Sequence, residues 1–168
     1  MTRLRTLWLI YGTLVFALVP LGIVAVTVFA EPPEGTDPAA VVPVLILIIA
    51  VRAVDHSTFA FIERQKPFGG PDATPASLAS DYQRRFILAA GLTSGGTILG
   101  FAGAAMTYEP WIFGVSVLAA IPAYVRDAPS SWSIRRRQEE ADANGAKASL
   151  LEGLQATGTR AQPYTPEP

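Results

Sequence analysis

One run of 25 residues without a charged side chain, from Thr6 to Ala30, limits what this chain can fold into more than any other feature. An α-helix rises about 1.5 Å per residue, so such a run is longer than the roughly 20 residues that cross the ~30 Å hydrocarbon core of a bilayer. Half of the 168 residues are hydrophobic and 16% are charged, whereas roughly a quarter are charged in soluble domains. The sequence predicts an all-α integral membrane protein.

Three more apolar runs predict further membrane spans, which makes four in total. We expect the spans at about 7–29, 38–60, 86–107 and 110–127, with a loop at 63–85 and a membrane domain over 1–129. The tail over 130–168 is expected to be partly helical and then disordered. The second span begins where Asp37 can cap a helix and Pro38 can occupy its first turn, and the fourth begins at Pro110. The four spans are expected to form two antiparallel helical hairpins.

The basic residues of the short connecting segments all lie on one side of this arrangement. They are Arg3 and Arg5 before the first span, Arg64, Lys66, Arg84 and Arg85 between the second and third, and Arg126, Arg135, Arg136 and Arg137 after the fourth. The other two connections, EPPEGTDP and the turn at TYEP, contain no Lys or Arg. Because short cytoplasmic segments carry the excess of Lys and Arg, we expect both termini and the 63–85 loop in the cytoplasm, with the chain as a multi-pass protein of the plasma membrane.

The first span has a second interpretation, as a cleaved signal peptide. The small residues of VFA before Glu31 resemble a cleavage site. The apolar region of a signal peptide is about 7–15 residues long, well below the length of this run. We therefore favour a retained span.

Three polar residues interrupt the second span: Arg52, Asp55 and His56. Arg52 lies three residues from Asp55 and four from His56, so all three share one helical face. Insertion scales assign a central Arg a cost of about 2.5–3.5 kcal/mol, which pairing with Asp55 would reduce. Three interpretations stay open: structural pairing of Arg52 with Asp55, snorkelling of Arg52 toward the headgroups, and a site for a ligand, an ion or a proton.

Depth in the bilayer selects partners for these residues. Four hydroxyl side chains are expected in the inner leaflet. They are Tyr11 near the inner end of the first span, Thr93 and Ser94 in the third, and Tyr124 near the inner end of the fourth. We predict a polar cluster in which Asp55 pairs with Arg52 and hydroxyls from Tyr11, Thr93 or Tyr124 complete the set.

The third span contains two pairs of glycines at four-residue spacing. Gly91 and Gly95 form one pair, and Gly96 and Gly100 form the other. Small residues at this spacing let helix backbones approach closely in a membrane. We expect the glycines to pack against the second or fourth span of the same chain, with self-association as the alternative.

The stretch RRFILAAGLTSGGTILGFAG, followed by a short turn and another span, loosely resembles the proteolipid (c) subunits of rotary proton ATPases. It is more similar to bacterial four-helix membrane proteins of unknown function. The resemblance covers Arg84 to Arg126. The proteolipid family carries an ion-binding carboxylate in mid-helix, whereas Thr93 and Ser94 occupy that neighbourhood here, so the likeness lies in helix packing.

The segments outside the spans carry a few local signals. Thr74 followed by Pro75 predicts the start of a helix that leads into the third span. Trp132 and the three adjacent arginines after it suit anionic headgroups, at about 1 kcal/mol per basic residue. Leu150, Leu151 and Leu154 form a short apolar patch suited to a partner contact, and from Thr157 onward we expect disorder.

Several classes of function are excluded by composition. The chain has no cysteine and one histidine, so it lacks thiolate and multi-histidine metal sites, and it shows no catalytic constellation or nucleotide-binding loop. A net charge of −1 gives no attraction to nucleic acid, and no cofactor is expected. Two hypotheses remain. The first is a structural or accessory component of a membrane complex, in contact with the bilayer and with a membrane protein partner or further copies of itself. The second is an oligomeric conducting or transporting unit that uses Arg52, Asp55 and His56.

Overall fold

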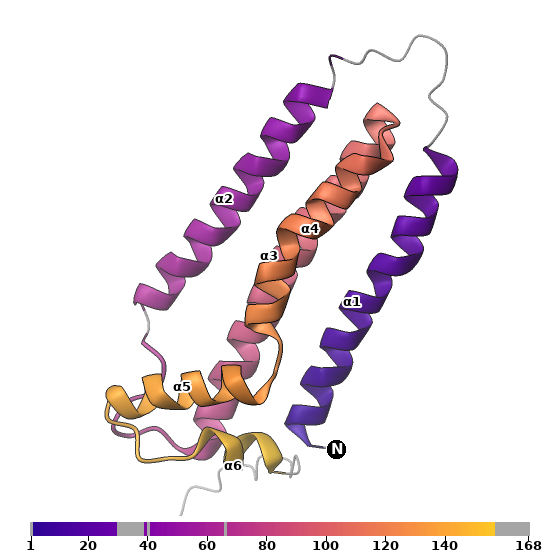
Figure 1. Cartoon of the computed structure of the whole chain (residues 1–168). Coiled ribbons are helices and arrows are strands. Elements are labelled where there is room, and N and C mark those ends of the chain that lie inside the picture. Colours follow the sequence, from indigo (N-terminus) through magenta and orange to yellow (C-terminus); the bar gives the residue numbers. More distant parts are fainter. Residues whose placement is uncertain (1, 30–38, 40, 66, 157–168) are drawn as a thin grey trace, which may run out of the picture.

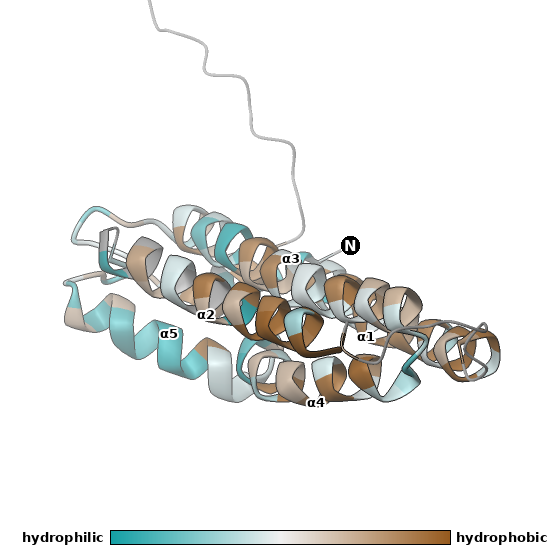
Figure 2. Ribbon diagram, turned by 90° about the horizontal axis from the view of Figure 1, so that it is seen from above, coloured by the Kyte–Doolittle hydropathy of each residue, from teal (hydrophilic) through white to brown (hydrophobic). Residues whose placement is uncertain are grey.

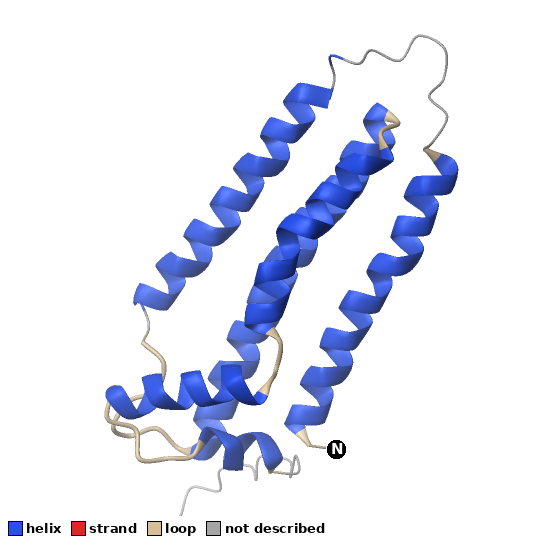
Figure 3. Ribbon diagram, in the orientation of Figure 1, coloured by secondary structure: helices blue, strands red, loops and turns tan. Residues whose placement is uncertain are grey.

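The computed structural model describes residues 2–29, 39, 41–65 and 67–156, apart from the side chains of residues 55, 56, 59, 62, 63 and 65. Every element in this part of the chain is a helix (Figure 3). The expected cap at Asp37 and Pro38, the EPPEGTDP connection and the tail from Thr157 lie outside the described residues.

Six helices follow one another along the chain. They are α1 (Arg3–Val28), α2 (Val41–Gln65), α3 (Pro75–Thr107), α4 (Pro110–Asp127), α5 (Ser131–Ala143) and α6 (Leu150–Gln155). The start of α3 shows why the chain turns helical there, because Thr74 and Ser77 each accept a hydrogen bond from the backbone N–H of the other, and Pro75 occupies the first turn. This is the helix start that Thr74 and Pro75 predict.

Two of the described helices, α1 and α3, are long and apolar enough to cross a membrane, and a third span results if α4 and α5 are counted as one broken helix bent by 59°. The chain is therefore a helical membrane protein. For α2, the described residues show an apolar helical stretch over Val41–Val54, and the expected span at 38–60 stays a prediction.

The helices α3 and α4 form the centre of the bundle, and α1 and α2 lie on opposite sides of this pair (Figure 1). The first residues of α1, the start of α3 and both short helices α5 and α6 lie together at one end. Figure 2 shows the hydrophilic residues gathered on α5 and on the adjoining part of α3, whereas the rest of the bundle is largely apolar. The molecule thus has an apolar shaft and one polar end.

The polar end is a folded cap with its own core. Leu150 and Leu154 of α6 are fully buried in a cluster with Phe68 and Leu78, and Leu7 of α1 belongs to the same cluster. Gly153 makes this packing possible, because a Cβ there would overlap the carbonyl oxygen of Pro75 at the start of α3. The leucine patch expected to face a partner is therefore used mainly inside the chain, and only Leu151 stays exposed.

Candidate functional site

Arg52 reaches from α2 into the space between α3 and α4, where it donates three hydrogen bonds to described residues. Its Nη1 donates to the carbonyl oxygen of Thr93 at 2.9 Å, and its Nη2 donates to the hydroxyl of Thr97 at 2.9 Å and to the carbonyl oxygen of Ser116 at 3.3 Å. A carbonyl oxygen has two lone pairs, so that of Ser116 can accept from Arg52 and also serve its own helix. One side chain therefore ties three helices together.

The guanidinium fits there because α3 has a glycine at the point of contact. A Cβ at Gly96 would lie 2.6 Å from Nη1 and 2.7 Å from Cζ of Arg52, closer than real Cβ contacts occur. The next turn of α3 repeats this pattern with α4, since a Cβ at Gly100 would overlap the side chain of Ser116. Gly96 and Gly100 thus have separate partners, α2 for the first and α4 for the second.

Further hydrogen bonds hold the acceptors of Arg52 in place. Thr97 donates its hydroxyl proton to the carbonyl oxygen of Thr93 at 3.0 Å, which leaves the lone pairs of Thr97 for Arg52. Ser116 donates to the carbonyl oxygen of Gly96 at 3.2 Å, across the α3–α4 interface. Thr97 and Ser116 are fully buried. The arrangement is an ordered polar network inside an otherwise apolar bundle.

The network differs in part from the predicted cluster. Thr93 contributes its carbonyl oxygen to Arg52, and the hydroxyl contact comes from Thr97. The side chains of Asp55 and His56 lie outside the described part of the structure, so the predicted pairing with Arg52 stays a prediction.

The other predicted hydroxyls form a separate set. Tyr11 donates to the carbonyl oxygen of Tyr124 at 3.3 Å, and the hydroxyls of Tyr124 and Ser94 lie 3.2 Å apart. This set joins α1 to α3 and α4. Because Thr93 and Ser94 are adjacent in a helix, their side chains diverge by about 100°, and the two sets lie on different faces of α3.

The two glycine pairs also differ in their surroundings. Gly96 and Gly100 are buried, whereas Gly91 and Gly95 are exposed, and a Cβ at either exposed position would have no described atom within 4 Å. The expected packing of the first pair is therefore not made within the described part of this chain. A glycine that sequence reasoning missed takes part instead: a Cβ at Gly103 would lie 2.6 Å from Cγ1 of Val44 on α2.

Sequence reasoning also missed Thr97 and Ser116. A usable signal existed for both residues. Thr97 follows Thr93 by one helical turn and shares its face, and Ser116 and Tyr124 are the two hydroxyl residues of the fourth predicted span.

In the described part of the structure, the Arg52 network is a cation held in place by neutral hydrogen-bond acceptors. Arginine stays protonated in proteins, and each hydrogen bond to a charged group contributes about 1.5–3 kcal/mol. Three such bonds offset the insertion cost of about 2.5–3.5 kcal/mol for a central arginine. Among the described residues, no group of His, Asp and Glu side chains has a geometry that suits a metal ion. The described contacts are those of a helix-to-helix connection.

No protein-family model, curated protein or solved structure matches this chain. The class is therefore defined by the fold and the site alone: a helical membrane protein with an arginine-centred polar network and a folded polar cap.

Proposed function

We propose that the chain is a non-catalytic, multi-pass membrane protein that acts as a structural or accessory component of a membrane complex. In this proposal α1 to α4 are four spans of the plasma membrane, and the polar cap with both termini lies in the cytoplasm. The single observation that carries the proposal is the use of Arg52: its described contacts hold α2 against α3 and α4.

An arginine at a conduction or transport site needs donors directed at a passing solute or at water. Here the described donors of Arg52 are directed at backbone carbonyls and a buried threonine on the two neighbouring helices. Hydroxyls also connect neighbouring helices: Tyr11 donates to the carbonyl oxygen of Tyr124, and the hydroxyl of Tyr124 bonds to that of Ser94. These contacts favour a structural role for the polar groups inside the apolar shaft.

The proposed topology rests on where the basic residues meet. Arg3 donates from the first turn of α1 to the carbonyl oxygen of Ala76 at the start of α3, at 3.2 Å. The arginines of α5 lie at the same end of the bundle as the start of α1 (Figure 1). An excess of Lys and Arg is typical of the cytoplasmic side, which supports placing this end inside the cell.

The exposed glycines of α3 supply the proposed contact with a partner. Gly91 and Gly95 lie one turn apart on the exposed surface of α3. The other pair at this spacing is already in contact with neighbouring helices, because Arg52 packs against Gly96 and Ser116 packs against Gly100. Close helix approach at such positions is the main source of helix association in lipid. We assign this surface to a helix of another membrane protein, or of a second copy of the chain.

Affinity purification in mild detergent, followed by mass spectrometry, tests the proposal. We expect wild-type protein to retain a stoichiometric partner or to run as a dimer, and Gly95→Leu to lose it with an unchanged melting temperature. Gly12→Leu is the matched control, because a Cβ at Gly12 on α1 also meets no described atom within 4 Å. Equal retention by both variants would remove the α3 surface from the proposal.

The conducting alternative is tested with the same purified protein in liposomes. Ionisable residues within a span are by default candidates for function, and this keeps Asp55 and His56 of interest. We expect ion and proton flux at the level of protein-free liposomes. Flux that Asp55→Asn abolishes would contradict the structural role and support a conducting unit.

A further inference from the structure

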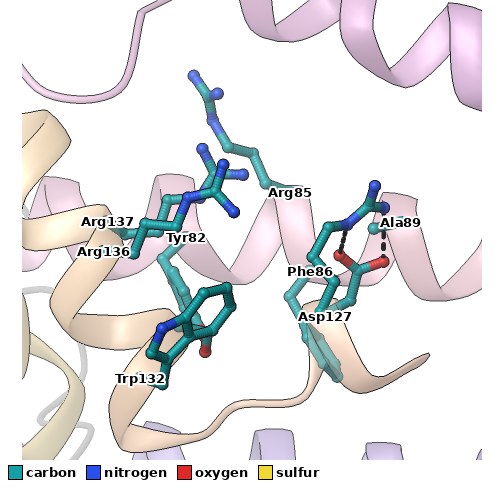
Figure 4. A pocket seen from close by; sticks show the side chains of 10 residues that line it. Tyr82, Arg85, Phe86, Ala89, Asp127, Trp132, Arg136 and Arg137 are labelled. Carbon is teal, nitrogen blue, oxygen red and sulfur yellow. Dashed lines mark hydrogen bonds and ion pairs between the residues drawn. The ribbon is translucent and has the colours of Figure 1, made fainter. Parts of the chain in front are cut away.

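A small hollow lies where α4 breaks into α5, and its lining is strongly basic. It measures about 130 Å³, and its charged lining residues are Arg85, Arg126, Arg136, Arg137 and Asp127, a formal charge of +3. Three helices supply these groups: α3, the last turn of α4 and the middle of α5. Figure 4 shows Arg85, Arg136 and Arg137 on one side, Asp127 on the other, and Trp132 and Tyr82 beside them.

Aromatic rings position the arginines. The guanidinium carbons of Arg85 and Arg137 lie 5.4 Å and 6.0 Å from the ring centroid of the fully buried Phe68. Arg136 lies over the ring of Trp132 at 5.6 Å. Such contacts stabilise a cation by about 0.5–2 kcal/mol and restrict its rotamers. The hollow is therefore lined by guanidinium groups that are already held in place.

The carboxylates around the hollow form pairs with several of these arginines. Arg126 binds Asp127 through two hydrogen bonds of 2.7 Å and 3.1 Å, drawn as dashed lines in Figure 4. Arg85 contacts Asp81 at 3.4 Å, and Arg137 contacts Glu140 at 2.6 Å. Four arginines and these three carboxylates leave a formal balance of +1 at the hollow.

A hydroxyl pair closes one wall of the hollow. The hydroxyls of Tyr82 and Ser133 lie 3.1 Å apart, and Ser133 donates its proton to the carbonyl oxygen of Ala128 at 2.7 Å, so Tyr82 is the donor to Ser133. Tyr82 precedes the apolar part of α3, and burial raises the pKa of its phenol above the ordinary value. This wall stays neutral.

The hollow lies at the level where the apolar shaft ends. Its α3 residues include Arg85 and Phe86, where the apolar segment of α3 begins, and its α4 residues are the last two of that helix. Trp132, which is 58% exposed, projects beside it, and tryptophan is enriched at membrane–water interfaces. The hollow thus faces the headgroup region of the leaflet that contains the polar cap.

From this geometry we propose that the hollow binds the phosphate group of an anionic lipid. The volume of about 130 Å³ is enough for a phosphate group. Planar guanidinium groups bind phosphate oxygens through paired hydrogen bonds. The exposed Trp132 and the depth of the site favour a lipid phosphate over a phosphate ion from solution. The proposal is independent of the role in a membrane complex.

Native mass spectrometry of the full chain in neutral detergent tests this proposal, with phosphatidylglycerol and phosphatidylcholine as probes. We expect one phosphatidylglycerol to bind saturably, and phosphatidylcholine to bind more weakly because its choline compensates the phosphate charge. Arg136→Gln should weaken phosphatidylglycerol binding about five-fold, which is the equivalent of about 1 kcal/mol per basic residue near a membrane surface. Arg136 is exposed, so this variant should fold and melt like wild type.

Arg135→Gln is the matched control, because Arg135 is the exposed neighbour on α5 and does not line the hollow. It removes the same charge from the same helix and should leave binding unchanged. An equal loss in both variants, or no loss in either, would overturn the site. Inorganic phosphate distinguishes the two sources: thermal stabilisation by phosphate ions without saturable lipid binding would refute the assignment to a lipid.

Discussion

Gly100→Ala is the sharpest test of the packing between α3 and α4. The added methyl would overlap both Cβ and Oγ of Ser116, whose side chain is too short to turn aside. Overpacking of this kind costs about 1–3 kcal/mol, and displacement of Ser116 would also remove its hydrogen bond to Gly96, for which about 0.5–1.5 kcal/mol is typical. Replacing a helical glycine by alanine returns about 0.5–1 kcal/mol. The expected net loss is about 1–3 kcal/mol.

Thermal unfolding in mild detergent measures this loss. At about 2–4 °C per kcal/mol for a chain of this size, Gly100→Ala should melt on the order of 5 °C below wild type. Gly95→Ala is the matched control on the same helix: its methyl would meet no described atom within 4 Å, so it should melt at or slightly above the wild-type temperature. If Gly100→Ala melts with Gly95→Ala, the close approach of α3 and α4 is wrong.

A second substitution across the interface makes the reasoning more specific. Ser116→Gly removes both overlapping atoms, and the nearest remaining atom of that residue, its Cα, would lie 3.7 Å from the new methyl, an ordinary contact. The double variant Gly100→Ala with Ser116→Gly should therefore be more stable than the sum of the single losses predicts, by more than the ~0.5 kcal/mol expected of independent sites. Additive losses would show that Gly100→Ala acts elsewhere.

Three further predictions concern other parts of the chain. If Asp55 pairs with Arg52, the double variant Arg52→Leu with Asp55→Leu should be more stable than the sum of the two single losses predicts, whereas additive losses would exclude the pair. Gly153→Ala should release α6 and speed proteolysis of the tail, because the new Cβ would overlap the carbonyl oxygen of Pro75. Gly70→Ala is the control: its Cβ would meet no described atom within 4 Å, so proteolysis should stay at the wild-type rate. In this cysteine-free chain, Asp72→Cys should react with an impermeant thiol reagent only after cells are permeabilised; labelling of intact cells would reverse the proposed orientation.

Local signals in the sequence were sufficient for the helices themselves. The charge-free run after Arg5 predicts α1, and Thr74 with Pro75 predicts the start of α3, because capping and run length depend on residues within one segment. The importance of Arg52 also follows from the sequence, since a charge in an apolar helix must find partners. None of these inferences requires knowledge of how two helices face each other.

The contacts between helices were decided by the tertiary structure. Gly91 with Gly95 and Gly96 with Gly100 have identical spacing, yet only the second pair is buried. In a soluble helix an apolar face would indicate which pair points inward. In a membrane helix the side that faces lipid is apolar as well, so hydropathy alone does not fix the rotation of α3 about its axis. The same rotation selects Thr97 as the partner of Arg52.

The polar cap shows the same division at longer range. The sequence identified the leucines of α6 and the arginines of α5 as notable, and assigned them to a partner and to headgroups. The structure buries Leu150 and Leu154 against the start of α3 and brings Arg85 and Arg126 beside Arg136. These residues are distant in the chain and meet only because α4 ends at a bend of 59° and α5 runs back across the bundle. A chain reversal of this kind depends on packing over the whole domain, which no single segment of the sequence encodes.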